Sequence, residues 1–269
     1  MRTHALPNPR VPETIPRRTT WEYGRGNARG ARGVRNDVGA WIELVGENGV
    51  VDVTDRPVIG IFGAGKVGTA LARLLLASGY EVRITGSPRQ TALDLLVSVV
   101  APGARVVPAA ELVAASDVII VAVPFGKAGT VPWELFDGKV VVDAMNYWPP
   151  VDGHIDSVDA DDRSTSEINA ARNPRARVVK SLNHLGYHEM EDDAMDAGSP
   201  LRRAIAVVGD DPEARAVLTR IIDDLGFDAV DGGPLAAGRA LEPGHPAFGR
   251  ELSAPELAGL LAPAAHLAA

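Results

Sequence analysis

Apolar residues follow two patterns along this chain, short continuous runs and helical spacing, and the two patterns alternate. From Val58 onwards, short runs of β-branched residues are followed by stretches whose apolar residues recur at helical spacing. The runs predict strands at 58–62, 81–85, 105–107, 118–123 and 139–143, and the stretches predict helices at 67–78, 91–99 and 109–115. Strands that alternate with helices in this way indicate an α/β fold with a doubly wound, mostly parallel sheet.

The C-terminal part repeats the alternation on a smaller scale. Residues 146–163 contain two prolines and five Asp and predict a surface loop. Ser164-Thr165-Ser166-Glu167 then has the pattern of a capping box, and Asp211-Pro212 has the acceptor and proline typical of a helix start. Further strands are predicted at 177–182, 204–208 and 227–230, with a last helix near 255–261. Residues 148–269 are therefore expected to form a small α/β extension that completes the sheet and a substrate pocket.

The first 55 residues lack this periodicity. Residues 1–35 hold eight Arg against two Glu, a net charge of +6. Because the whole chain carries −8, the remainder carries −8 − 6 = −14. We expect residues 1–55 to be a disordered basic leader, with a hairpin over 41–53 where two apolar runs flank Glu47-Asn48-Gly49. A polybasic arm and a later chain start near Val51 are the alternatives.

Composition excludes several classes of protein. The chain contains no cysteine, so it has no disulfide, thiol nucleophile or Cys-ligated metal. No apolar run reaches the roughly 18–20 residues of a membrane helix, and no apolar segment follows the first arginines as in a secretory signal. The acidic body disfavours nucleic acid as a partner. A cytoplasmic protein that binds small molecules is expected, with a homodimer as one option for its assembly.

The most specific motif is Gly63-Ala64-Gly65-Lys66-Val67-Gly68, directly after a predicted strand and at the start of an amphipathic helix. In a dinucleotide-binding loop the first glycine makes a tight turn, the second lets the backbone approach a pyrophosphate, and the third lets helix and strand pack closely. The phosphate charge lies on the helix N-terminus. The context of strand, loop and helix therefore predicts a Rossmann-type domain over 56–147.

The end of the second strand indicates which dinucleotide binds. NAD-binding domains usually have an acidic residue there for the ribose 2′-hydroxyl. Here the segment Ile84-Thr85-Gly86-Ser87-Pro88-Arg89 contains no acid. Because a hydroxyl at Ser87 and a guanidinium at Arg89 suit a 2′-phosphate, NADP(H) is favoured over NAD(H). A plain polar turn is the alternative.

Two further strand ends reach the same edge of the predicted sheet. Val123-Pro124-Phe125 follows one strand, and Asp143-Ala144-Met145-Asn146 ends the next. Open α/β sheets bind ligands beyond the carboxyl ends of their strands. Val123, Pro124, Phe125 and Asn146 are therefore candidates to flank the nicotinamide, and ordinary strand exits are the alternative.

These residues resemble those of the F420-dependent NADP oxidoreductases, NADPH-dependent reductases of the deazaflavin coenzyme F420. The resemblance runs from about Val58 to Gly233 and includes 163–164, 178–184, 209–211 and 231–235. It implies that Ala64, Gly65, Lys66 and Val67 contact the pyrophosphate, that the 86–89 turn holds the 2′-phosphate, and that 123–125 lie at the nicotinamide. Phe125 stands where the family has Trp, and Pro88 where Arg is usual.

The resemblance implies direct hydride transfer between nicotinamide and deazaflavin, which needs positioning and exclusion of water more than a side-chain acid or base. No catalytic pair is identified. Asn183 and His184 follow a predicted buried strand, and are expected either to reach the second-substrate pocket or to form a structural pair. His184, His188 and Glu189 are not expected to bind a metal, because Gly186 interrupts any common helix.

Other enzyme classes find less support. Lys180 and Asn183 invite comparison with β-hydroxyacid dehydrogenases, but Lys180 lies in a predicted strand rather than on a helix. No nucleophile-elbow motif of a hydrolase is present. The sequence predicts an NADP(H)-dependent oxidoreductase acting on coenzyme F420. A reductase of another carbonyl, imine or flavin acceptor and a non-catalytic NADP(H) sensor are the alternatives.

Overall fold

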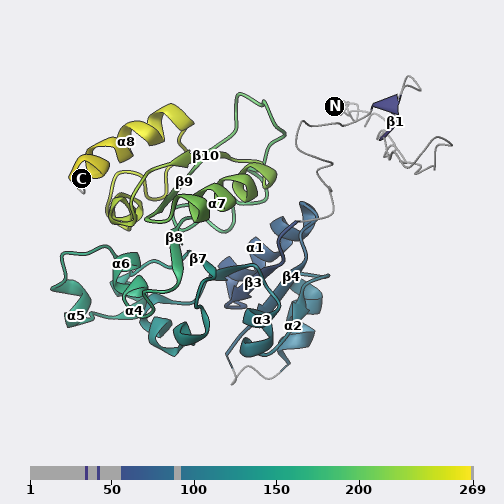
Figure 1. Cartoon of the computed structure of the whole chain (residues 1–269), viewed down its shortest axis with the longest axis horizontal. Helices are drawn as coiled ribbons and strands as arrows, with labels where there is room; N and C mark the ends of the chain where they lie inside the picture. Colours follow the sequence, from purple (N-terminus) through teal and green to yellow (C-terminus); the bar gives the residue numbers. More distant parts are fainter. Residues whose placement is uncertain (1–33, 36–40, 43–55, 88–91, 268–269) are drawn as a thin grey trace, which may run out of the picture. The chain divides into compact units, whose positions relative to one another are not determined.

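The computed structural model describes residues 34–35, 41–42, 56–87 and 92–267 (Figure 1). The chain divides into two compact units, Met1–Thr54 and Asp55–Ala269. In the first unit β1 (Val34–Arg35) pairs antiparallel with β2 (Trp41–Ile42). The hairpin predicted over 41–53 thus has its first strand paired with an upstream segment, and its remainder lies outside the described residues, as does most of the predicted leader.

The second unit is built on one eight-stranded sheet in the order β10-β9-β8-β7-β6-β3-β4-β5. Its strands are β3 (Ile59–Phe62), β4 (Val82–Thr85), β5 (Arg105–Val106), β6 (Val118–Val121), β7 (Val140–Asp143), β8 (Arg177–Lys180), β9 (Ala204–Gly209) and β10 (Asp228–Asp231). Neighbouring strands are parallel except β8 and β9, where Lys180 lies opposite Val208. The predicted doubly wound, mostly parallel sheet with an α/β extension is confirmed. The boundary predicted at 147/148 falls between β7 and β8 of this sheet.

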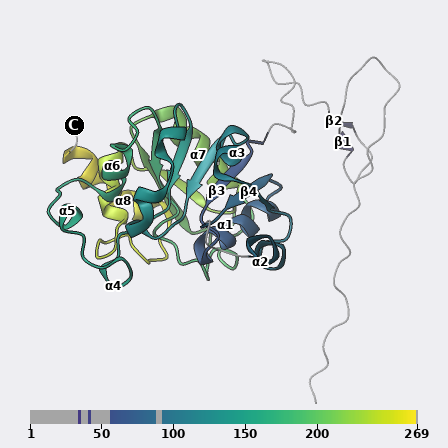
Figure 2. The same cartoon turned by 90° about the horizontal axis from the view of Figure 1, so that it is seen from below.

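Helices cover both faces of the sheet. They are α1 (Lys66–Ala77), α2 (Leu93–Val100), α3 (Ala109–Ala114), α4 (Pro149–Asp152), α5 (Asp156–Asp159), α6 (Thr165–Ala170), α7 (Pro212–Asp224) and α8 (Ala254–Leu267), with 3-10 helices η1 (Phe125–Thr130), η2 (Trp133–Leu135) and η3 (Leu235–Leu241). In Figures 1 and 2, α1, α2 and α3 gather around β3 and β4 at one end of this unit, and α8 lies toward the other end. No helix among the described residues is long and apolar enough to cross a membrane.

The surface loop predicted over 146–163 contains two short helices that the sequence did not predict, α4 and α5. The prolines that suggested a loop stand at the first positions of α4, where a fixed φ favours the helix and no N–H is lost. The carboxylate of Asp152 then accepts hydrogen bonds from Trp148 N and Gly126 N, at 2.9 and 2.8 Å. The segment is therefore tied to the loop that follows β6.

Burial on both faces of the sheet explains why the sequences of the central strands are continuous apolar runs. Every residue of β3, β6 and β7 is buried. Alternate residues face opposite clusters: Ile59 and Ile61 pack with Leu71 of α1, whereas Ile119 packs with Leu112 of α3. Because both faces are covered, the strands need apolar residues at every position.

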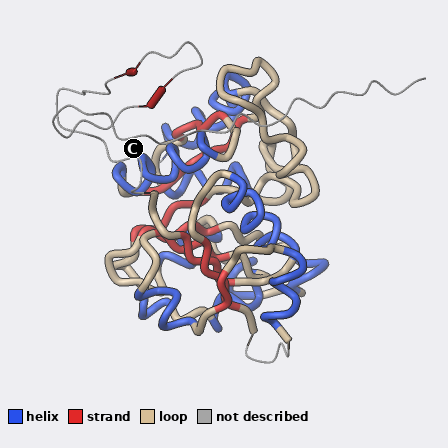
Figure 3. The backbone as a smooth tube through the Cα atoms, turned by 90° about the vertical axis from the view of Figure 1, so that its right-hand side faces the viewer, coloured by secondary structure: helices blue, strands red, loops and turns tan. Residues whose placement is uncertain are grey.

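The chain direction decides where the loops meet. The strands from β3 to β8 run parallel, so their carboxyl ends reach one edge of the sheet, and β9 and β10 end at the opposite edge. Figure 3 shows the strands running through the middle of this unit with helices around them. The loops after β3, β4, β6, β7 and β8 therefore converge on one edge. The predicted site residues come from these five loops.

Candidate functional site

Two glycines of the loop after β3 are required by the protein itself. Gly63 has a φ of +117°, and a Cβ there would lie 2.3 Å from the carbonyl oxygen of Ala122 after β6. A Cβ on Gly68 would lie 1.8 Å from the Gly63 oxygen, where α1 leaves the sheet. Both positions therefore hold β3, α1 and the β6 exit in close contact, as the sequence motif predicts.

Gly65 differs, because nothing in the protein demands it. Its φ of −86° is accessible to any residue, and no described atom lies within 4 Å of the position of a Cβ. Gly65 caps α1 without a side-chain hydrogen bond, and the first turn of α1 carries no acidic residue. At the start of α1 the backbone N–H groups thus have no side-chain cap, and the space that a side chain of residue 65 would take is open. Such a cradle fits a pyrophosphate.

The end of β4 is described as far as Ser87, which is exposed at the edge of the sheet. Arg89, the predicted partner of a 2′-phosphate, lies outside the described residues. Its role stays a prediction.

The loop after β6 divides its residues between surface and core. Pro124 is exposed and Val123 is half-buried. The Phe125 side chain is only 3% exposed, and its ring centroid lies 5.5 Å from that of Tyr147. Val123 and Pro124 are therefore the residues of this loop that the edge presents, and Phe125 supports them from the core.

Asn146 and Asn183 meet at the ends of β7 and β8. Asn146 Nδ2 donates to the Asn183 carbonyl at 2.6 Å, and Asn183 Nδ2 donates to Asn146 Oδ1 at 2.9 Å and to the Leu241 carbonyl at 2.7 Å. Leu182 precedes this pair with a φ of +61°, an unfavourable conformation for a buried leucine. This backbone turn brings Asn183 to Asn146. A predicted cofactor residue and a predicted substrate residue are thereby joined.

His184 points elsewhere. Its ring is 3% exposed, and Nε2 accepts a hydrogen bond from Ala206 N of β9 at 3.3 Å. Burial lowers the pKa of His184 to about 3, and the positive charges of Arg203 and Lys180 add to that shift. The neutral imidazole is therefore a structural group between β8 and β9 in this conformation, and a contact with substrate stays a prediction.

Two buried charged residues support the edge, and the sequence indicated neither role. Lys180 Nζ donates to the Met145 carbonyl at 3.1 Å and to Thr165 Oγ1 at 3.4 Å. Asp143 accepts from Ser166 Oγ at 2.7 Å and from Met145 N at 3.0 Å. Both hold the segment before Asn146. The only signal in the sequence is a charged residue at the end of each apolar strand.

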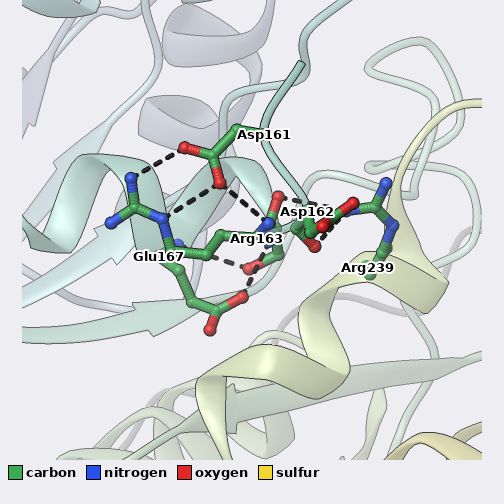
Figure 4. Close-up of polar contacts among 6 residues, drawn as sticks. Asp161, Asp162, Arg163, Glu167 and Arg239 are labelled. Carbon is green, nitrogen blue, oxygen red and sulfur yellow. Dashed lines mark hydrogen bonds and ion pairs between the residues drawn. The ribbon is translucent and has the colours of Figure 1, made fainter. Parts of the chain in front are cut away.

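The start of α6 is fixed from η3. Arg239 Nη1 donates to the carbonyls of Asp162 and Arg163, at 2.8 and 3.1 Å (Figure 4). The Arg163 side chain pairs with Asp161, and Glu167 closes the predicted capping box with Ser164. The loop after β7 is therefore attached to the C-terminal extension as well as to the β6 loop.

Comparisons with known proteins agree with this geometry. Residues 58–147 match the family described as NADP oxidoreductase coenzyme F420-dependent. The metalloreductase STEAP3 of Rattus norvegicus is 30% identical over 193 residues, which cover 70% of this chain and 36% of that protein. Erythronate-4-phosphate dehydrogenase of Pseudomonas fluorescens is 33% identical over 120 residues, 44% of this chain and 28% of that enzyme. The chain thus spans about a third of the length of these curated relatives.

Solved structures show the same fold over more of the chain. A hypothetical protein of Sinorhizobium meliloti is 28% identical with a TM-score of 0.63, covering 73% of this chain and 95% of that one. A proposed F420-dependent NADP reductase of Arthrobacter sp. FB24 is 24% identical with a TM-score of 0.59, covering 69% and 88%. The matched family segment contains the glycine loop and the strands β3 to β7. Residues 58–147 of this chain are therefore similar to the family described as NADP oxidoreductase coenzyme F420-dependent.

Proposed function

We propose that this protein binds NADP(H) and transfers hydride between its nicotinamide and the deazaflavin coenzyme F420. The observation that carries the proposal is the open space at Gly65, at the start of a helix without a side-chain cap and two residues after Gly63, which packs on the β6 exit. A glycine that the fold does not need, at the point where a pyrophosphate would approach, supports a dinucleotide cradle. The family match supports the choice of acceptor.

Each loop at the edge then has a role. The N–H groups of Gly65, Lys66 and Val67 hold the pyrophosphate, and Ser87 and Arg89 hold the 2′-phosphate. Val123, Pro124 and Asn146 orient the nicotinamide, which supplies the hydride when bound. Since hydride transfer needs no proton donor, the residues at this edge bind, align and exclude water.

The segment after β7 offers a surface for a flat acceptor. The Trp148 side chain is 54% exposed, although an indole is among the most costly groups to leave in water. Its backbone is held to Gly126 through the shared Asp152 carboxylate. An exposed ring on a segment that is bonded to the loop after β6 supports a planar, aromatic second substrate.

The comparison with curated proteins also supports an acceptor other than coenzyme F420. A curated relative that matches 70% of this chain is a metalloreductase. The same NADPH cradle would therefore serve reduction of another acceptor, and a sensor that binds NADP(H) without turnover would use it too.

An anaerobic assay of NADPH oxidation with and without coenzyme F420 tests the proposal. We expect oxidation that depends on F420 in the wild type. Gly65→Ala is expected to weaken NADPH binding at least about ten-fold, because the methyl group fills the cradle while the fold has room for it. Gly259→Ala, at an exposed position of α8 with no atom within 4 Å of a Cβ, is the matched control and should leave affinity unchanged.

The outcomes separate the alternatives. Oxidation with a carbonyl, imine or flavin but not with F420 would assign a different acceptor. Tight NADPH binding with no oxidation by any acceptor would indicate the sensor. Unchanged affinity in Gly65→Ala would show that the dinucleotide lies elsewhere.

A further inference from the structure

A segment of the C-terminal extension lies along the helix of the dinucleotide site. We call Gly186–Asp193 the strap. Tyr187 of the strap contacts Lys66, the first residue of α1, whose Nζ lies 5.4 Å from the centre of the tyrosine ring. Two turns further along α1, Arg73 pairs with Glu191 of the strap through three hydrogen bonds of 2.6–3.0 Å, although the two residues are 118 positions apart. The strap therefore follows one face of α1 from its N-terminus.

The strap is also held from its other side. The Arg203 side chain is 5% exposed and donates to Glu189 at 2.8 Å and to Asp193 at 2.6 Å. Met190, between these two carboxylates, is completely buried. Because the strap is anchored from Glu189 to Asp193, directly after Tyr187 and His188, the position of Tyr187 is determined by the fold and not by Lys66 alone.

Lys66 stands at the one place where a cation matters most for a dinucleotide. It follows Gly65 directly, and its side chain is exposed. A free lysine side chain samples many rotamers, and holding it in one of them costs entropy on binding. The ring of Tyr187 attracts the ammonium through its π-face, and the His188 ring packs on Tyr187 with 3.9 Å between centroids. The aromatic pair thus restrains the ammonium close to the helix N-terminus.

We propose that Tyr187 is a positioning residue of the dinucleotide site: it holds the Lys66 ammonium where it neutralises the pyrophosphate bound at the start of α1. The C-terminal extension thereby completes the phosphate subsite, in addition to any contact with the acceptor. The inference rests on the dinucleotide part of the proposed function and does not depend on which acceptor is reduced.

The strength of the contact between Lys66 and Tyr187 sets the expected loss of NADPH affinity. A cation–π pair at an exposed site is worth about 0.5–1 kcal/mol, which corresponds to a two- to five-fold change in affinity. Loss of the Lys66 charge itself removes a partner of the pyrophosphate, whatever rotamer the side chain adopts. Lys66→Met is therefore expected to weaken NADPH binding more, about ten-fold, and to reduce its dependence on salt.

A double-mutant cycle on NADPH binding, measured by calorimetry at two salt concentrations, tests the inference. Tyr187→Leu is expected to weaken binding two- to five-fold in the wild-type chain and to have no effect in the Lys66→Met background. Tyr187→Phe keeps the π-face and should retain wild-type affinity. Glu191→Gln, which removes the ion pair of the strap with Arg73 of α1, is the matched control and should bind NADPH normally.

Several results would overturn the inference. These are an equal effect of Tyr187→Leu in both backgrounds, a loss in Tyr187→Phe as large as in Tyr187→Leu, or an equal loss in Glu191→Gln. Thermal unfolding of each variant shows whether a loss reflects the fold, and a fold-based loss also overturns it. Absence of NADPH binding in the wild type would overturn the dinucleotide assignment as well, whereas binding without F420 turnover would affect only the acceptor.

Discussion

At the scale of single residues, the glycine loop shows how far a motif can be interpreted without a structure. The spacing of Gly63, Gly65 and Gly68 predicted three different tasks, and the contacts at Gly63 and Gly68 match two of them. The direction of a side chain was harder to predict. His184 follows a buried strand like Asn183, yet it turns to β9, because the next strand in the chain is antiparallel.

Arg89 carries the expected preference for the 2′-phosphate. Arg89→Ala should weaken NADPH binding about ten- to a hundred-fold, because a guanidinium makes charge-assisted, bidentate hydrogen bonds to phosphate. NADH binding should change little. Titration of the variant with NADPH and with NADH measures both affinities. Arg105→Ala of β5, at a mostly exposed arginine, is the control. Equal losses for the two cofactors would contradict the preference.

At the scale of elements, helix starts fall into two kinds. Ser164 accepts from Glu167 N at the start of α6, and Asp211 accepts from Glu213 N and Ala214 N at the start of α7, whereas α1 has no side-chain cap. The capped starts were predictable from the sequence. The short α4 and α5 were not, because they depend on contacts from outside each helix: Asp152 of α4 accepts from the distant Gly126, and Asp159 of α5 accepts from Tyr147.

Asp211 lets the structural role of a cap be measured. Asp211→Ala should destabilise the protein by about 1–2 kcal/mol, since two N–H groups of α7 lose their partner and the guanidinium of Arg177 keeps only Glu213. In thermal unfolding this corresponds to a fall of roughly 2–8 °C. NADPH affinity should not change. Asp211→Asn keeps an acceptor for α7 and should recover part of the loss; no recovery would mean that the ion pair dominates.

At the scale of the whole molecule, contacts between distant parts of the chain decide what the sequence could not show. The alternation of strands and helices predicted the sheet, and the sheet predicted which loops converge. It could not predict that Thr165 would bond to Glu242, 77 positions away, or that Tyr187 would reach Lys66. Such pairs depend on how the C-terminal extension packs, and no local pattern encodes that packing.

The response of stability to acid is a property of the whole fold. His184 has a folded-state pKa of about 3, below the roughly 6.5 of an unfolded histidine, so the unfolded chain binds a proton that the folded chain does not. Stability should therefore fall as the pH drops below about 6.5, by roughly 3 kcal/mol at pH 4 from this group. Denaturant unfolding between pH 7 and 4 should show a flatter pH dependence for His184→Phe. His154→Gln, at an exposed histidine, should keep the wild-type slope; identical slopes in all three proteins would exclude His184 as the cause.

The reversal of chain direction between β8 and β9 has a consequence for the electrostatic field of the molecule. Because β9 runs against β3, α7 begins at the edge of the sheet opposite to the start of α1. The partial positive charges of the two helix starts therefore cannot add over one ligand. At α7 the carboxylate of Asp211 already balances that charge, and at α1 no side chain does. The part of the sheet formed by β9, α7 and β10 thus contributes packing without creating a competing anion site at α7. The polarity of the sheet directs anionic ligands to the edge where α1 begins.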